Sequence, residues 1–314
     1  MKETNPSTVR WGVIGAGNVC EYKSGPPLYK LPNASLSLVY RRDRKAGTSF
    51  VERHGHGRYV DRLEDLLESD EIDAVYVATP HARHAEQTIA ALRAGKPVMV
   101  EKPMAINTRE CDEMVATARE TALPLGVAYY RRGYPSIARL RELITDGAIG
   151  RVQTAAFNNE FPTSHRLDLV HCLFGDITQA RTLPGNNDPY SFESTIDRFE
   201  VRTEGDVVVR MMTGWSESGM PEAIRVDGES GTLHLHDLKG GRLSLVRNRT
   251  TEELDCGTLP YTHWGLFDNF NRHLLEGVPL LCDGVEGRKS TVILDCLQAI
   301  RTPREWVEVD YQGY

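Results

Sequence analysis

Residues 9–20, VRWGVIGAGNVC, carry the clearest indication of the fold class. The first six residues predict a buried strand, and Gly15 and Gly17 follow directly. In a G-x-G-x-x-G turn between a strand and a helix, the first glycine makes the turn and the second admits a pyrophosphate at the helix N-terminus. Cys20 stands where a third Gly or Ala is usual, and it is small enough to pack against the strand. A tight structural turn is the alternative interpretation, but the strand context favours dinucleotide binding.

Outward from this stretch, strand-like runs alternate with helical patterns. Further runs lie at residues 36–40, 74–78 and 97–100. Between them come amphipathic helical segments, and Asn107 with Glu110 forms a capping box before the last of these helices. Alternation of this kind predicts a parallel sheet covered on both faces. We therefore expect an α/β protein whose N-terminal domain, residues 1–124, is of the Rossmann type.

The pattern changes after Leu125. A helix is expected at 136–145, followed by strands joined by turns without regular helices, at 152–157, 192–201, 207–212 and 223–226. A last helix at 288–300 precedes a strand-like run at 306–309. These segments predict a C-terminal α+β domain, residues 125–314, with a large, mostly antiparallel open sheet. Its final segment is free to pack back between the two domains.

Composition narrows the class of protein. The 314 residues carry a formal net charge of -7, so no overall positive field exists to hold nucleic acid. No apolar run reaches the roughly 20 residues that a membrane-spanning helix requires, and the polar N-terminus carries no signal-peptide core. The six cysteines lie far apart without a Cys-x-x-Cys pair, which is typical of a reducing compartment. We expect a cytoplasmic protein that binds a small molecule.

The end of the second strand indicates which dinucleotide is bound. NAD selection uses an acidic residue there to hydrogen-bond the ribose 2′-OH. Here Tyr40 ends the strand, and Arg41 and Arg42 follow it. Guanidinium groups pair with phosphate, so NADP is favoured over NAD. A solvated charged loop is the alternative interpretation.

Two further loops follow predicted parallel strands. Thr79, Pro80, His81 and His84 come after the strand ending at Ala78, and Glu101-Lys102-Pro103 comes after the strand ending at Val100. Ligands bind at the carboxyl ends of the strands in open α/β sheets. With the glycine turn, the predicted cofactor-binding residues are Gly15, Gly17, Asn18, Val19, Arg41, Arg42, Thr79, Pro80, His81, His84, Glu101 and Lys102.

The order GAGN, VATPHARHAEQTIAALRAGKPVMVEKPMA and GVAYYRRGYPSIARLRELITDGAIG resembles the glucose–fructose oxidoreductase/inositol dehydrogenase (Gfo/Idh/MocA) family. The resemblance continues weakly to the C-terminus. It implies NAD(P)-dependent redox chemistry on sugars, cyclitols or related polyols, and a C-terminal sheet that forms a homodimer or homotetramer. It also implies that Lys102 is the active-site lysine. An ammonium group can stabilise the alkoxide that develops as hydride leaves a carbinol carbon.

The family's second motif, D-x-x-x-H with a further Asp three residues on, is only partly present. His165 and Asp168 match it, but Phe161 occupies the position of the first Asp. Phe161 indicates either an altered substrate or lost activity. The resemblance makes His165 a second catalytic candidate beside Lys102. The tentative substrate residues are Lys23, Tyr130, Arg131, Phe161 and Asp168.

The segment Lys23–Pro27 is expected to leave the first helix as a loop, because proline cannot donate a helical hydrogen bond. His54-Gly55-His56-Gly57 is interpreted as a glycine-capped helix end rather than a metal site, and we expect no bound metal. Three functions remain open. They are an NADP-dependent oxidoreductase, an enzyme that oxidises its substrate transiently for elimination, epimerisation or glycoside cleavage, and a catalytically idle nucleotide sensor.

Overall fold

The computed structural model describes residues 7–158, 163–183, 198–212 and 223–312. The chain divides into two compact units, Met1–Gly133 with Pro260–Arg288, and Tyr134–Leu259 with Lys289–Tyr314. This differs from the single boundary expected at residue 124. Residues 125–133 remain with the first unit because Leu125–Val127 forms the last strand of its sheet. The segment Pro260–Arg288 also belongs to the first unit, and its local sequence pattern does not predict this.

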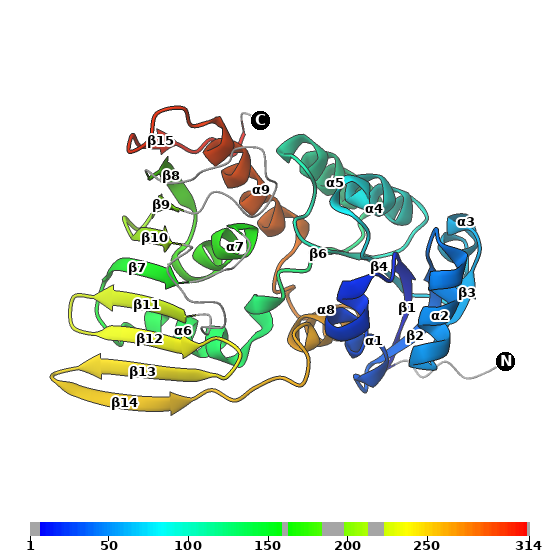
Figure 1. The fold of residues 1–314 in the computed structure, drawn as a ribbon, viewed down its shortest axis with the longest axis horizontal. Coiled ribbons are helices and arrows are strands. Elements are labelled where there is room, and N and C mark those ends of the chain that lie inside the picture. The colour runs from blue at the N-terminus through cyan, green and yellow to red at the C-terminus, as the bar shows by residue number, and fades with distance from the viewer. Residues whose placement is uncertain (1–6, 159–162, 184–197, 213–222, 313–314) are drawn as a thin grey trace. The chain divides into compact units, whose positions relative to one another are not determined.

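The first unit contains a six-stranded sheet in the order β3-β2-β1-β4-β5-β6, in which every pair is parallel. Its strands, labelled in Figure 1 except for β5, are β1 Val9–Ile14, β2 Ala34–Tyr40, β3 Arg58–Val60, β4 Ala74–Val77, β5 Val98–Val100 and β6 Leu125–Val127. This is the doubly wound order in which the strand sequence reverses between β1 and β4. The predicted Rossmann-type sheet is confirmed.

Burial explains why these strands form. All four residues of β4 and all three of β5 are buried, as expected for a sheet covered on both faces. The covering helices are α2 Arg44–His54, α3 Leu63–Leu67, α4 His84–Arg93 and α5 Thr108–Thr121. Asn107 caps α5 by accepting from the Glu110 N–H at 2.9 Å, and Gly55 ends α2 in the left-handed conformation. The predicted caps at Asn107 and Gly55 are confirmed, but the Glu110 carboxylate accepts from the Ile106 N–H at 3.5 Å instead of completing the capping box on Asn107.

The segment after the glycine turn differs from the expected loop. Residues Cys20–Ser24 form a π-helical turn, η1, and Pro27–Lys30 forms the short helix α1. Gly25 and Pro26 between them keep right-handed helical dihedral angles, and the Gly25 N–H donates to the Cys20 carbonyl at 3.1 Å. This wider turn passes the chain through two prolines, which have no N–H to donate, without leaving the helical path. The prediction of a loop at Lys23–Pro27 was wrong.

The later segment of the first unit packs onto its sheet through helix α8, Trp264–Glu276. Trp11 of β1 is fully buried, and its ring lies 5.2 Å from that of Phe267 and 5.4 Å from that of Phe270. The Trp11 Nε1–H donates to Asn271 Oδ1 at 3.0 Å. A tryptophan near the N-terminus thus anchors a helix from the far end of the chain.

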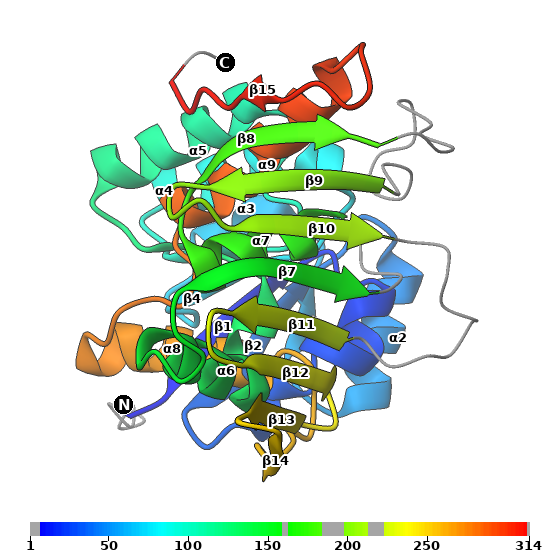
Figure 2. The same cartoon turned by 90° about the vertical axis from the view of Figure 1, so that its left-hand side faces the viewer.

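The second unit is built on a nine-stranded sheet, seen face-on in Figure 2, in the order β14-β13-β12-β11-β7-β10-β9-β8-β15. Its strands are β7 Val152–Asn158, β8 Ile177–Thr182, β9 Arg198–Thr203, β10 Val208–Met212, β11 Ala223–Gly228, β12 Thr232–Asp237, β13 Arg242–Arg247, β14 Thr250–Asp255 and β15 Val307–Glu308. All pairs are antiparallel except β7 with β10, so the expected mostly antiparallel sheet is confirmed.

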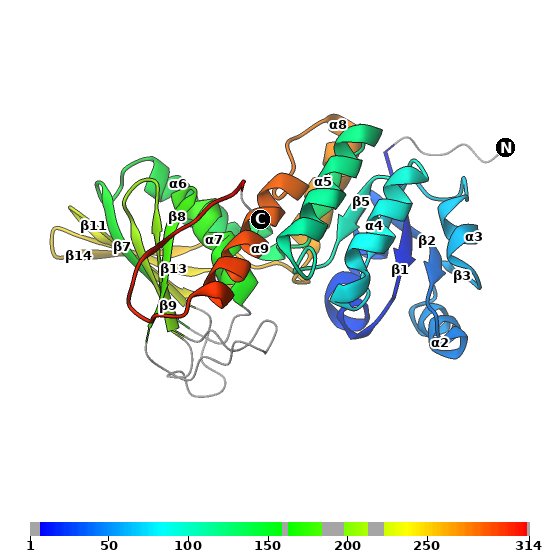
Figure 3. The ribbon, with the colours of Figure 1, turned by 90° about the horizontal axis from the view of Figure 1, so that it is seen from above.

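Helices cover one face of this sheet. Helices α6 (Pro135–Thr145) and α7 (Thr163–Phe174) lie against it, and α9 (Gly284–Ala299) runs beside α7 (Figure 3). Buried side chains on neighbouring strands, Phe199, Met211, Phe157 and Ile224, are in register on one row. The adjacent row carries charged or small side chains. Within the described ranges, no helix is long and apolar enough to cross a membrane.

Candidate active site

The glycine turn has the geometry that a dinucleotide requires. Gly15 has φ +116°, and a Cβ there would lie 2.2 Å from the Ala78 carbonyl oxygen, so only glycine fits between β1 and β4. A Cβ on Gly17 would meet no atom within 4 Å, which leaves room for a pyrophosphate against the backbone. Cys20 is fully buried, and burial raises the pKa of its thiol to about 12. It therefore packs where a third glycine would, as expected.

The end of β2 presents basic side chains. An Arg41 Nη1–H donates to the Ala16 carbonyl at 2.7 Å, which holds this guanidinium against the glycine turn. Arg42 is exposed. The nearest following carboxylate, Asp43, caps α2 by accepting from the Ala46 N–H at 3.0 Å. Strand β2 ends at Tyr40, so the residue at that position is not an acid that could accept from a ribose 2′-OH.

The loops after β4 and β5 are held together by His84, the first residue of α4. Its ring is fully buried, with Nδ1 2.9 Å from the Pro103 carbonyl oxygen and Nε2 2.9 Å from that of Thr79. Both ring nitrogens face backbone rather than open space. His84 therefore joins the Thr79 loop to the loop that carries Lys102, and its expected role in cofactor binding stays a prediction.

Lys102 and His81 lie at the same edge of the sheet. Lys102 is partly exposed directly after β5, and His81 is partly exposed in the short helix η2, His81–Arg83, after β4. The pKa of His81 is lowered, first by burial and then by the positive charge of Lys102. The two residues follow β4 and β5, which are neighbouring strands of the sheet. Pro80, which directly precedes His81 in the loop after β4, is exposed.

The buried side chain of Glu101 accepts hydrogen bonds that hold the loop after β5 in place. It is 5% exposed, and its Oε1 accepts hydrogen bonds from Tyr76 Oη at 2.5 Å and His263 Nε2 at 3.0 Å. Its Oε2 accepts from the backbone N–H of Lys102 at 3.1 Å. The carboxylate of Glu101 thus holds the backbone N–H of Lys102, and the expected role of Glu101 in cofactor binding stays a prediction.

The charge of Glu101 follows from these partners. Burial alone would raise the pKa of the carboxyl, but the His263 bond and charge, the Tyr76 bond and the Lys102 charge lower it to about 2. The pKa of Tyr76 is raised far above its usual value, first by burial and then by the charge of Glu101. Glu101 is therefore an anion and Tyr76 a neutral donor throughout the physiological range.

Tyr76 and His263 were not foreseen from the sequence. Tyr76 lies in the apolar run AVYVA, where a lone hydroxyl gives little signal. His263 precedes α8, and its ring lies 4.3 Å from that of Tyr130. Arg131 in turn places its guanidinium 5.0 Å from the Tyr130 ring centre and donates to its hydroxyl at 3.1 Å. The candidate substrate residues Tyr130 and Arg131 are thus in contact with the network around Glu101.

The remaining candidates that the structure describes lie on the segment after the glycine turn and on α7. Asn18, Val19 and Lys23 follow the glycine turn in helical conformation, and all three are exposed. His165 and Asp168 are buried on α7 of the second unit, at 1% and 0% exposure. Phe161 lies outside the described residues. The catalytic role of His165 and the substrate roles of Asp168 and Phe161 therefore stay predictions.

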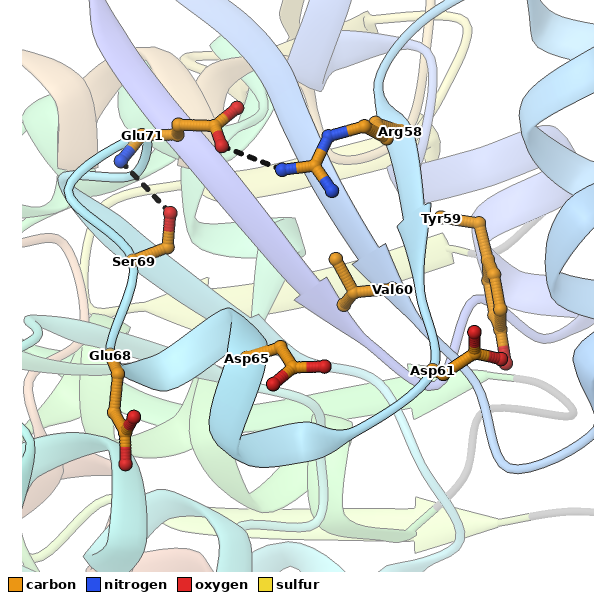
Figure 4. A pocket seen from close by; sticks show the side chains of 8 residues that line it. All are labelled: Arg58, Tyr59, Val60, Asp61, Asp65, Glu68, Ser69 and Glu71. Atoms are coloured by element: carbon orange, nitrogen blue, oxygen red, sulfur yellow. Dashed lines mark hydrogen bonds and ion pairs between the residues drawn. The ribbon is translucent and has the colours of Figure 1, made fainter.

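A surface pocket on the first unit is not part of this site. It lies along β3 and α3 and is lined by Arg58, Tyr59, Val60, Asp61, Asp65, Glu68, Ser69 and Glu71 (Figure 4). Arg58 is already paired with Glu71 at 2.6 Å. The other charged residues lining it are carboxylates, which repel a phosphate. In the same described ranges, no three His, Cys, Asp or Glu side chains are arranged to hold a metal ion.

Acid titration tests the charge of Glu101. Because its pKa is lowered from 4.5 to about 2, ionised Glu101 stabilises the folded protein fully above pH 4.5, and this contribution is lost as the pH falls towards 2. We expect the wild-type melting temperature to fall more steeply between pH 4.5 and about 2 than that of Glu101→Gln, measured by circular dichroism. Glu86→Gln, which changes an exposed carboxylate on α4, is the control and should keep the wild-type slope. Parallel curves for the wild type and Glu101→Gln would contradict the assignment.

Comparison with known proteins agrees with this geometry. Residues 9–129 match the model of the Gfo/Idh/MocA oxidoreductase family with an NAD-binding Rossmann fold. The chain is 39% identical over 149 residues to oxidoreductase P35 of Formosa agariphila, covering 48% of this chain and 46% of that protein. It is 35% identical over 143 residues to a 1,5-anhydro-D-fructose reductase of Ensifer adhaerens, covering 45% and 42%. The aligned part thus spans about half the length of these curated relatives.

A solved structure extends the likeness in fold over nearly the whole chain. The 3-ketoreductase KijD10 of Actinomadura kijaniata, solved with NADP, superposes with a TM-score of 0.77 over 93% of this chain and 97% of its own, at 21% identity. The family match and the curated relatives thus show that the N-terminal part of the chain, residues 9–129, is similar to the Gfo/Idh/MocA oxidoreductase family, and the likeness to KijD10 shows the fold alone.

Proposed function

We propose that this protein is an NADP-dependent oxidoreductase that transfers hydride between the nicotinamide and a carbinol or carbonyl carbon of a sugar, cyclitol or related molecule. The observation that carries the proposal is the arrangement of the first unit's carboxyl edge. The open glycine turn follows β1 and Lys102 follows β5, on either side of β4 and the strand-order reversal where such sheets bind nucleotides.

The residues of this edge have distinct roles in the proposal. The open space at Gly17 accepts the pyrophosphate, and Arg41 and Arg42 take the 2′-phosphate. The bound nicotinamide supplies or accepts the hydride. Lys102 binds the reacting oxygen and stabilises its negative charge while the proton moves. His165 is proposed as a second acid–base group.

Substrate binding is assigned to a second set of residues. Tyr130 and Arg131, joined by a hydrogen bond at 3.1 Å, are assigned to this set together. Lys23, Phe161 and Asp168 complete the proposed set. The names of the sugar-related relatives support a substrate of this class. A panel of sugars, anhydrosugars and cyclitols, followed by absorbance of the reduced nicotinamide, tests it. Turnover of none of them, in either direction, would sink the proposal.

The cofactor preference has its own test. We expect NADP to bind at least tenfold more tightly than NAD, equivalent to about 1.4 kcal/mol, because guanidinium groups pair with the 2′-phosphate. Arg41→Ala with Arg42→Ala should abolish the difference by weakening NADP binding alone, as measured by calorimetry. The matched control is Arg44→Ala, which removes an arginine of the same stretch that pairs with Asp61 at 2.9 Å. A wild type that prefers NAD would refute the basic-residue argument.

The other two functions considered for the sequence gain no support from the reported relatives, whose names describe an oxidoreductase and two reductases. Net consumption of free cofactor separates the leading proposal from both. A nucleotide that co-purifies and is never consumed would favour transient oxidation. Binding without chemistry across the panel would favour a sensor.

We also propose that the protein forms a homodimer or homotetramer through the second unit's sheet. Among the described elements, helices lie on one face only (Figure 2). The other face carries an in-register row from β8 to β11 in which Arg181 and Arg210 both pair with the buried Glu200 and Arg225 is exposed. Sedimentation equilibrium distinguishes a monomer from these assemblies.

A further inference from the structure

A buried chain of hydrogen bonds runs beneath the candidate active site. Its centre is Glu101, whose three donors come from three separate parts of the first unit, β4, the β5 loop and the residue before α8. A carboxylate can only accept, so Nε2 of His263 carries the proton that it shares with Glu101. The Thr262 hydroxyl lies 3.0 Å from the other ring nitrogen. His263 is thus held at both nitrogens and is 1% exposed.

The backbone around His263 fixes this placement. The turn η3, Tyr130–Gly133, packs against the start of α8. A Cβ on Gly265 would lie 2.4 Å from the Gly133 carbonyl oxygen, and one on Gly133 would lie 2.9 Å from the Leu266 nitrogen. Only a pair of glycines permits this contact. It brings the His263 ring against Tyr130 while Nε2 reaches Glu101.

His263 therefore has two contacts that matter for the site, one with Glu101 and one with Tyr130. Glu101 in turn accepts from the backbone N–H of Lys102. Loss of the His263 donor leaves a buried carboxylate short of one partner, which it must replace by moving or by admitting water. Either response changes the acceptor that anchors Lys102.

We propose that His263 is a positioning residue of the oxidoreductase site: it fixes the Glu101 carboxylate, and through it the Lys102 backbone, while its ring holds Tyr130. This inference rests on the proposed function for its effect on turnover, but not for its effect on Lys102. Small misplacements of a reacting group are costly, since a shift of about 1 Å can reduce turnover about 100-fold.

Two substitutions separate the contacts of His263. His263→Phe keeps a ring against Tyr130 and removes the donor. His263→Gln keeps an N–H that can reach Glu101 and removes the ring. We expect the Phe variant to lose roughly 10–100-fold in kcat with less than about threefold change in the KM for nucleotide, and the Gln variant to recover most of that loss.

A second measurement does not depend on turnover. Exchange of the Lys102 backbone amide, followed by NMR of protein labelled with 15N-lysine, should speed up in His263→Phe and return towards the wild-type rate in His263→Gln. Tyr76→Phe removes the other side-chain donor to Glu101 and should also speed it up, which keeps the test available if His263→Phe fails to fold. The matched control is His273→Gln, on helix α8 directly after His263, whose ring nitrogen lies 2.7 Å from the Val278 carbonyl oxygen. It should leave both kcat and Lys102 exchange unchanged.

The outcomes are distinguishable. Faster Lys102 exchange in His263→Phe and Tyr76→Phe, without any turnover in the wild type, would support the positioning role and refute the proposed function. Unchanged Lys102 exchange with a lowered melting temperature alone would overturn the positioning role and leave His263 a packing residue. Equal effects of His263→Phe and His273→Gln on kcat would overturn it as well.

Discussion

Lys102→Ala should lose roughly 10²–10⁴-fold in turnover while binding NADP as tightly as the wild type, because general acid–base groups typically contribute this much to a rate. The lysine follows β5 at the ligand edge of the sheet, and its positive charge lowers the pKa of the neighbouring His81. Its backbone N–H is anchored to Glu101, so truncation at Cβ leaves the loop in place. The measurement is steady-state turnover on whichever substrate the panel identifies, with nucleotide affinity by calorimetry.

The control for this variant is Lys239→Ala, which removes an exposed lysine from the second unit. It should keep both turnover and affinity. Near-normal turnover in Lys102→Ala would exclude the proposed role. Equal losses of turnover and nucleotide affinity would instead show that Lys102 contributes to binding rather than to the hydride-transfer step.

Trp11→Ala should be the most destabilising single substitution considered, costing about 3–5 kcal/mol of unfolding free energy. The indole is fully buried, packs on two phenylalanines of α8 and donates to Asn271. Its removal leaves a cavity between β1 and α8, and an amide oxygen without its donor. Thermal or urea unfolding of the apo protein measures the effect.

Trp306→Ala is the matched control, because its ring is also packed but only partly buried. Two arginines stack on it, with Arg181 at 4.3 Å and Arg202 at 5.1 Å from the ring centre. Each such contact contributes about 0.5–1 kcal/mol, so the expected cost is only about 1–2 kcal/mol. A cost for Trp11→Ala no larger than this would mean that α8 is not anchored through the indole.

Much of the first unit could be predicted because its signals are local. Strand β1 was expected at residues 9–14 and is observed there, since an apolar run followed by Gly15 leaves little choice. The boundary at residue 124 was less accurate, because β6 is a three-residue strand and its place in the sheet depends on pairing with β5. Helix α8 was missed although its apolar residues repeat at helical spacing, and its packing on β1 could not be predicted because its partner Trp11 is far away along the chain.

The parts of the site that belong to sequence motifs could be predicted. The glycine turn directly follows β1 and Lys102 follows β5, as expected. The hydrogen bonds of Glu101 and His84 were not foreseen, because burial and the direction of a side chain are properties of the folded protein. The π-turn at Cys20–Ser24 escaped prediction, since proline rules describe ordinary α-helices. His263 could not be linked to Glu101 from sequence, because only the folded chain brings them to 3.0 Å.

The hydrogen bond between Trp11 and Asn271 also has a consequence for folding during synthesis. The two residues are 260 positions apart. At translation rates of about 5–20 residues per second, roughly 10–50 s pass between their appearance on the ribosome. During that interval the N-terminal strands have been synthesised but helix α8 has not. The Trp11 side chain therefore cannot yet be buried against it. The nucleotide-binding unit, although its sequence starts first, is therefore finished late, after most of the second unit has been synthesised.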